Sequence, residues 1–187
     1  AAITTVQNAI SFVQLQDGDL SAAASIVDRM AALRSMYDDV TKSDVDKSNY
    51  NTEFQSLRVQ LYQASEGKFN GVSLFTAQTW GSQTVAQKDV IEVLTSERGN
   101  SGSKVSLGKV QLLSAVTVRD SANANANMSV GNYTIQVFTP DNALAADAKS
   151  ASTTVSLGSF SVDAFILALQ NISTVRAENG ATSSRLQ

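Results

Sequence analysis

The first forty residues place apolar side chains at intervals of three, four or seven positions. These side chains are Ile3, Val6, Ile10, Val13, Leu20, Val27, Met30, Leu33, Tyr37 and Val40. Such intervals put the apolar residues on one face of a helix, so the pattern predicts a long helix over residues 1–40. Gly18 lies between two aspartates, and because glycine costs about 1 kcal/mol relative to alanine inside a helix, it could mark a bend.

A second helix is predicted to begin after Ser43. Ser43 and Asp46 have the spacing of a loose capping box, and the apolar positions within residues 50–64 alternate in steps of four and three. We expect Gly67 to end this helix in a left-handed conformation, because glycine adopts that conformation without steric cost. The Asn-Gly pair at residues 70–71 predicts a turn immediately afterwards.

The middle of the chain, residues 72–155, has a different composition, with Ser, Thr, Asn and Gly between β-branched residues. Residues 90–94 and 133–138 are rich in β-branched and aromatic side chains and predict strands. The glycines and polar residues of 99–102 predict a hairpin connection. Residues 121–127, a serine followed by alternating Ala and Asn, predict a polar loop.

The end of the chain returns to a helical pattern. Most of its apolar residues fall on one face, and Ser161 is placed to cap the first turn; these residues are Val162, Phe165, Ile166, Leu169, Ile172 and Leu186. The stretch 176–182 has few large apolar residues and would be a marginal helix in isolation, so it is expected to pack against a neighbouring helix.

Together these patterns predict a mainly α fold with a β-rich insert. We expect an elongated antiparallel bundle of the N- and C-terminal long helices, plus a β-hairpin or small β region. Two terminal helices of about 30 to 40 residues would be roughly 45 to 60 Å long, which is too long for a compact globule. The predicted division is a helical rod segment at 1–75, a variable β-rich region at 76–158 and a helix at 159–187 that completes the rod.

Composition excludes several classes of function. The chain of 187 residues contains no histidine and no cysteine, so the commonest general base, transition-metal ligands and thiolate nucleophile are all missing. We therefore expect no enzyme activity, no catalytic residues, no metal and no cofactor. A net charge of −3 without a basic run argues against nucleic acid. The longest apolar run is far shorter than the roughly 20 residues that cross a bilayer, so no membrane insertion is expected.

Four segments resemble the bacterial flagellin family. Residues 8–18 and 26–33 look like its amino-terminal region, residues 68–74 resemble its phenylalanine-asparagine-glycine signature, and residues 172–181 resemble its carboxy-terminal region. The resemblance covers about residues 1–75 and 160–187, in the family's order. It also implies a core fragment that lacks the extreme terminal coiled-coil segments of the family at both ends.

The resemblance implies a structural subunit of the bacterial flagellar filament. Its expected partners are other flagellin subunits, packed side to side for motility. It would be secreted to the extracellular filament without a cleaved signal peptide. A trimmed chain of this kind is expected to be monomeric. Two alternatives stay open: a hook-filament junction protein, which shares the terminal helices, and a surface module for carbohydrate or host binding carried on a flagellin core.

The resemblance also points to three candidate contact residues. The Toll-like receptor that senses flagellin recognises one face of the first two helices in many family members. Matching to that epitope selects Arg29 and Leu33 in the first helix and Glu53 in the second. Ala31 and Ala32 depart from the family pattern, which weakens the receptor interpretation. The alternatives are that Arg29 and Glu53 are solvated or contact a neighbouring subunit, and that Leu33 belongs to the core.

Overall fold

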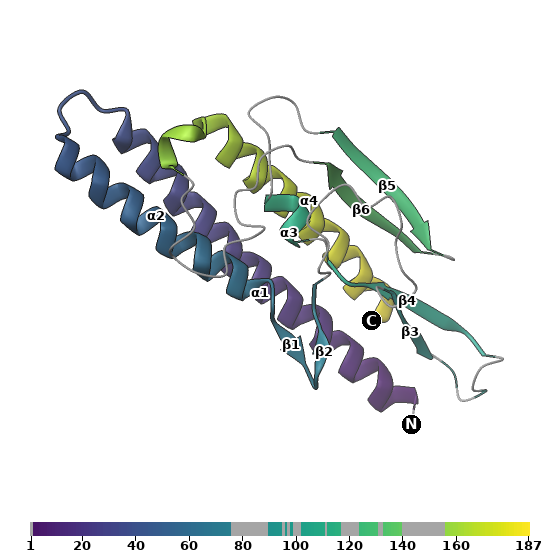
Figure 1. The fold of residues 1–187 in the computed structure, drawn as a ribbon. Coiled ribbons are helices and arrows are strands. Elements are labelled where there is room, and N and C mark those ends of the chain that lie inside the picture. Colours follow the sequence, from purple (N-terminus) through teal and green to yellow (C-terminus); the bar gives the residue numbers. More distant parts are fainter. Residues whose placement is uncertain are drawn as a thin grey trace.

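Three helices form the frame of the molecule: α1 (Ala2–Tyr37), α2 (Asp44–Ala64) and α4 (Val162–Leu186). The computed structural model describes residues 2–75, 90–94, 96, 98, 102–110, 112–116, 124–130, 133–139 and 156–187. The helices lie side by side along one axis and make the molecule a rod (Figure 1). With 36 residues, α1 is about 54 Å long at 1.5 Å per residue. At 25 residues, α4 is shorter than the sequence analysis expected.

Helices α1 and α4 are antiparallel, and the two ends of the chain lie at the same end of the rod (Figure 1). Asn179 near the end of α4 contacts Val13 near the start of α1, whereas Phe160, just before α4, contacts Arg34 near the end of α1. Helix α2 returns along α1 after the turn at residues 38–43. The predicted fold class, an elongated antiparallel helical bundle with a small β region, is therefore confirmed.

The core lies where the apolar faces of the three helices meet. Its buried side chains include Leu20, Val27, Met30 and Leu33 of α1, Phe54, Leu57 and Leu61 of α2, and Phe165, Ala168, Ile172 and Val175 of α4. Phe54 packs edge-on against Phe160 and Phe165, with ring centroids 5.9 and 6.1 Å away. The predicted stripe is wrong at its two ends, because Ile3 is 75% exposed and Val40 is 97% exposed. Val40 lies in the turn beyond the end of α1, where no helix covers it.

The expected capping chemistry is present at the start of α2 and at the start of α4. Ser43 Oγ accepts a hydrogen bond from the Asp46 amide, and the Asp46 carboxylate accepts one from the Ser43 amide, which completes the predicted capping box. Ser161 caps α4 by accepting from the Ala164 amide at 3.2 Å. Helix α1 continues through Gly18 without a break, and the bend suggested at that residue stays a prediction.

Gly67 does not have the left-handed backbone that the sequence predicted. Among the described residues, positive φ angles occur at Asn70 (50°) and Gly71 (80°), in the predicted turn. Gly67 is instead a point of close approach: a Cβ atom there would lie 2.6 Å from Asp19 Oδ2 and 3.2 Å from Leu74 Cδ1. The requirement for glycine at 67 is therefore spatial, whereas at 71 it is conformational.

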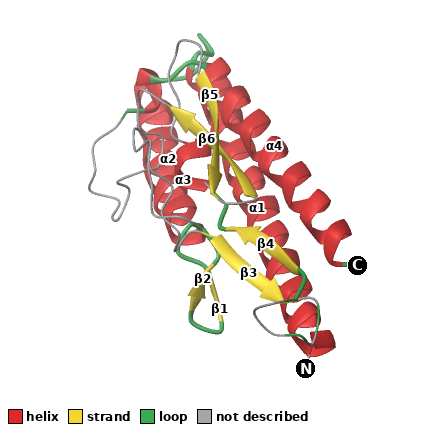
Figure 2. Ribbon diagram, turned by 90° about the vertical axis from the view of Figure 1, so that its right-hand side faces the viewer, coloured by secondary structure: helices red, strands yellow, loops and turns green. Residues whose placement is uncertain are grey.

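The middle of the chain forms antiparallel hairpins. The pairs are β1 (Lys68–Phe69) with β2 (Val72–Ser73), β3 (Val90–Leu94) with β4 (Lys104–Gly108), and β5 (Ala124–Val130) with β6 (Tyr133–Thr139). Figure 2 shows β3–β4 and β5–β6 along one side of the helical frame. Two short helical turns, α3 (Leu112–Val116) and η3 (Leu157–Ser159), complete the described elements.

The predicted strands at 90–94 and 133–138 are confirmed as β3 and β6. The prediction of a polar loop over 121–127 is wrong for residues 124–127, which belong to β5 and pair with β6. The pairing of β3 with β4 fits the hairpin predicted at 99–102, although residues 99–101 lie outside the described part of the chain. The domain boundaries at 75/76 and 158/159 stay a prediction.

Candidate functional site

The three candidate contact residues lie together where α1 and α2 run side by side. Arg29 of α1 donates two hydrogen bonds to Glu53 of α2, from Nε to Oε1 at 2.7 Å and from Nη2 to Oε2 at 3.1 Å. The two side chains are 48% and 40% exposed, so the pair is on the surface. The Glu53 carboxylate raises the pKa of Arg29, chiefly through the hydrogen bond. Leu33, one turn further along α1, is fully buried.

This geometry divides the three residues into two kinds. Arg29 and Glu53 present a fixed pair of opposite charges that a second protein can reach, because about half of each side chain is open to solvent. Leu33 can reach no partner directly with its side chain, since none of it is exposed. The interpretation of Leu33 as a core residue therefore agrees with its burial.

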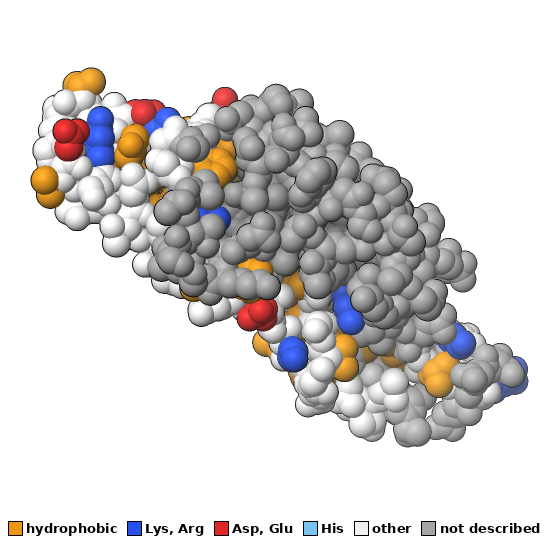
Figure 3. Space-filling model, viewed as in Figure 1, with side chains coloured by type: hydrophobic (Ala, Val, Ile, Leu, Met, Phe, Trp, Pro, Cys, Tyr) orange, Lys and Arg blue, Asp and Glu red, His pale blue; other side chains and the backbone are white. Residues whose placement is uncertain are grey.

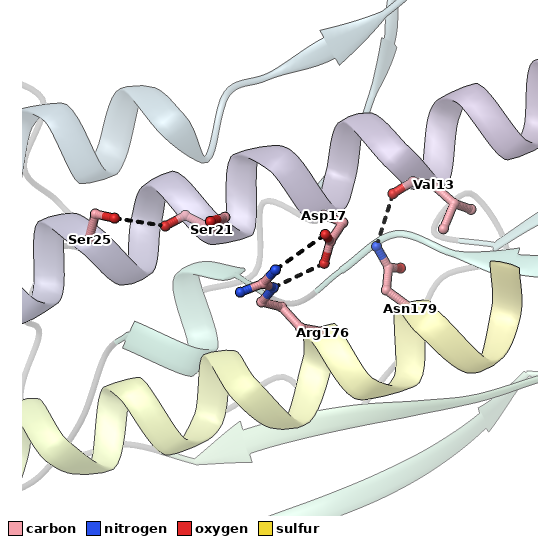
Figure 4. Close-up of polar contacts among 6 residues, drawn as sticks. All are labelled: Val13, Asp17, Ser21, Ser25, Arg176 and Asn179. Carbon is pink, nitrogen blue, oxygen red and sulfur yellow. Dashed lines mark hydrogen bonds and ion pairs between the residues drawn. The ribbon is translucent and has the colours of Figure 1, made fainter.

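A second two-bond ion pair joins the first and last helices (Figure 4). Arg176 of α4 donates from Nε to Asp17 Oδ1 at 3.0 Å and from Nη2 to Asp17 Oδ2 at 3.3 Å. The Asp17 carboxylate raises the pKa of Arg176. One turn further along α4, Asn179 Nδ2 donates to the carbonyl of Val13 at 3.3 Å. These contacts explain how the apolar-poor end of α4 stays helical against α1.

The surface beside this ion pair is slightly hollowed. A recess of about 290 Å³ lies between α1 and α4, lined by Val13, Gln14, Asp17, Asn179, Gly180 and Ser183. On the exposed side of α1 in the same view, Ser25 Oγ bonds back to the Ser21 carbonyl at 3.3 Å (Figure 4). Small and polar residues on an outer face allow close, reversible contact with another protein while avoiding indiscriminate aggregation.

Sequence reasoning missed the polar residues that tie the frame to the rest of the chain. Gln16 of α1 donates to the Leu74 carbonyl at 2.7 Å, and Asn171 of α4 donates to the Ala115 carbonyl at 3.0 Å. Both side chains are buried. The signal available in the sequence was their position, since each amide falls at a helix face that is otherwise apolar.

The turn between α1 and α2 forms one end of the rod. Residues 38–47 carry four aspartates and two lysines. Hydrogen bonds from Thr41 lower the pKa of Asp39, and hydrogen bonds from Ser43 lower the pKa of Asp46, so both carboxylates are held in the charged form. Val40 and Val45 are 97% and 69% exposed at the same end. This end is acidic with two exposed valines.

The opposite end of the rod has the other sign of charge. The described residues of the β3–β4 hairpin and its continuation, 90–94, 96, 98 and 102–110, carry one glutamate, Glu92, against three basic residues, Arg98, Lys104 and Lys109. Lys68 in β1 and Arg185 at the end of α4 add to them. Figure 3 shows Lys and Arg towards the lower right end and a mixture of acidic, basic and apolar side chains at the upper left end.

The described part of the chain offers no other recognisable site. Within residues 2–75, 156–187 and the described strands between them, no three His, Cys, Asp or Glu side chains gather into a group that could hold a metal ion. Nor is any helix in this described part long and apolar enough to cross a bilayer.

Comparison with known proteins finds a solved structure with a similar fold. Neither a protein-family model nor a curated protein matches the chain. The fold is similar to the crystal structure of *Bacillus cereus* flagellin, with a TM-score of 0.64 and 19% sequence identity. The match covers 100% of this chain and 85% of that one. At this identity the likeness concerns the fold alone, and it shows that the chain has a flagellin-like fold.

Proposed function

We propose that this chain is a structural subunit of a bacterial flagellar filament, which works by packing against copies of itself. The observation that carries the proposal is the antiparallel α1–α4 rod, because its full length matches a flagellin fold. A rod with a largely apolar core and exposed polar residues on its outer faces is suited to stacking in a lattice. Repeated head-to-tail contacts between identical rods produce an open filament.

The partner we propose is a second copy of the chain. The acidic end at residues 38–47 and the basic end that carries Arg98, Lys104 and Lys109 are complementary, so one rod can follow another in the same orientation. The exposed Val40 and Val45 supply apolar area at the centre of such a contact. Charge complementarity of this kind selects orientation and speeds encounter more than it adds affinity.

Arg29 and Glu53 are proposed as contact residues on the side of the rod. Their fixed, half-exposed charges suit a neighbouring subunit, and they equally suit the Toll-like receptor that senses flagellin. We propose that Leu33 acts indirectly, because it is a fully buried core residue one helical turn from Arg29. No catalytic role and no cofactor are part of the proposal.

The proposed location is the extracellular filament, reached by export without a cleaved signal peptide. In this reading the role of the chain is motility. Two alternatives use the same frame: a hook-filament junction protein, and a module in which residues 76–158 bind a carbohydrate or host surface. A glycan array probed with the full chain distinguishes the second alternative, since a filament subunit is expected to bind none of the glycans.

The test is assembly. We expect the chain alone to sediment as a monomer, and the chain extended at both ends with the terminal helices of a flagellin to form filaments visible by electron microscopy. The charge-reversal variant Asp44→Lys should slow filament growth, and adding Lys104→Glu should restore part of the rate because opposite charges then meet again. Extended chains that stay monomeric under conditions that polymerise ordinary flagellin would refute the proposal.

A further inference from the structure

The Asn-Gly dipeptide occurs twice in this chain, at residues 70–71 and 179–180, in contrasting surroundings. Asn70 and Gly71 are exposed and form the two-residue loop between β1 and β2, with φ angles of 50° and 80°. Asn179 lies inside α4, is 5% exposed and donates its side-chain amide to the Val13 carbonyl. Asn70 is therefore exposed to solvent, whereas Asn179 is buried and hydrogen-bonded.

We infer that Asn70 is a site of spontaneous deamidation, whereas Asn179 is protected from the same reaction. The Gly71 amide nitrogen attacks the side-chain carbonyl carbon of Asn70, and a new carbon–nitrogen bond closes a succinimide ring. The bond from that carbon to Nδ2 breaks, and ammonia leaves with the proton that Gly71 loses. Water then opens the ring at one of its two carbonyls and gives either aspartate or isoaspartate.

The local structure favours this reaction at Asn70. A Cβ atom built on Gly71 would meet no atom within 4 Å, and both residues of the pair are exposed, so the space around this turn is open. Strands β1 and β2 are only two residues long, and a hairpin of this length opens easily to the backbone angles that ring closure needs. At Asn179 the same angles require unwinding of a packed helix, which is a much rarer event.

The product would alter the structure around the turn. Isoaspartate carries the chain through its side-chain carbon and lengthens the backbone, so the two-residue loop can no longer keep Phe69 opposite Val72. Phe69 packs edge-on against Phe12 of α1, with ring centroids 6.2 Å apart. Either product also adds a negative charge beside Lys68, at the basic end of the rod. This inference concerns the chain itself and does not depend on the proposed function.

The test follows both sites in one sample of the full chain, kept folded in mildly alkaline buffer. Trypsin yields residues 69–88, in which Asn70 is the one asparagine, and residues 177–185, in which Asn179 is the one asparagine. Mass spectrometry measures conversion of amide to acid in each peptide. We expect conversion at Asn70 to exceed that at Asn179 by at least about tenfold, because the two sites differ in how often they open.

The same incubation in concentrated urea provides the control. Both sites should then convert at similar rates, since unfolding removes the protection of Asn179. A product at Asn70 that is a substrate for an isoaspartate-specific methyltransferase would identify the succinimide route, and the Asn70→Gln variant should lose the reaction because its ring would be larger. Equal conversion at both sites in the folded chain, or a faster reaction at Asn179, would overturn the inference.

Discussion

Removing the ring of Phe54 should cost more stability than other single changes in α2. Phe54 is fully buried and packs edge-on against Phe160 and Phe165, so it joins α2 to the start of α4. Truncation of a buried phenylalanine to alanine costs about 3 to 5 kcal/mol, through lost burial and the cavity left behind. A domain of this size is stable by about 5 to 15 kcal/mol, so Phe54→Ala should remove a large fraction of the total.

Urea unfolding followed by far-ultraviolet circular dichroism measures the loss of unfolding free energy directly. Thermal unfolding followed by the same signal gives the melting temperature. The melting temperature should fall by roughly 6 to 20 °C, at about 2 to 4 °C per kcal/mol for a chain of this length. Two variants serve as controls. Phe54→Leu keeps most of the volume and should cost less than the alanine variant, and Gln60→Ala, on the exposed side of α2, should change stability by less than about 0.5 kcal/mol.

The reasoning fails if Phe54→Ala destabilises the chain no more than Gln60→Ala does. It also fails if Phe54→Leu costs as much as the alanine variant, since the loss would then not scale with the volume removed. A changed dependence of the unfolding free energy on urea would mean that the unfolded or folded state itself has changed, and the comparison would need the thermal data instead.

Three further predictions test other contacts. Gly18→Ala should stabilise the chain by about 1 kcal/mol in urea unfolding, because Gly18 lies within a helix and has open space around it. Gly67→Ala should destabilise the chain, because a Cβ atom at residue 67 would lie too close to Asp19. A gain in stability from both variants would contradict this geometry. Burial raises the pKa of Glu178 above its ordinary value of 4.5, so the charged carboxylate destabilises the folded state at neutral pH. This destabilisation disappears as the pH falls through the folded-state pKa and the carboxylate becomes protonated. Glu178→Gln should therefore be more stable than the parent at pH 7, with a difference that shrinks by pH 4; a pH-independent difference would exclude this cause. A double-mutant cycle on Asp17 and Arg176 should give a coupling of about 0.2 to 1 kcal/mol that weakens in high salt, and zero coupling at low salt would show that the pair contributes nothing.

The helical part of the fold was predictable because its signals are local. Ser43 and Ser161 each carry the capping atom within three residues of its partner, and the apolar spacing within α1 and α4 records the helical period directly. The predictions were wrong where tertiary contacts determine whether a side chain is buried. Ile3 fits the same stripe as Val13, yet the stripe cannot reveal where the covering helix ends.

The middle region was less predictable because its signals are not local. Alanine and asparagine have low strand propensity, so residues 124–127 read as a loop until β6 supplies the pairing partner. The role of Gly67 could not be separated from that of Gly71 either, because a close approach to Asp19 is invisible in the order of residues. The family resemblance selected Arg29 and Glu53 as candidate contacts. Their mutual ion pair could not be predicted, because it depends on how α1 and α2 pack in three dimensions.

Four hydrogen bonds that join the helical frame to other described parts of the chain share one property: on the far side each involves a main-chain atom. Gln16, Asn171 and Arg34 donate to backbone carbonyls of residues 74, 115 and 160, and Asn51 accepts from the backbone amide of residue 157. Every amino acid supplies those carbonyls, and all but proline supply the amide. These four hydrogen bonds do not depend on which side chains occupy residues 74, 115, 157 and 160, so a substitution other than proline at one of these positions can keep the bond to the helical frame.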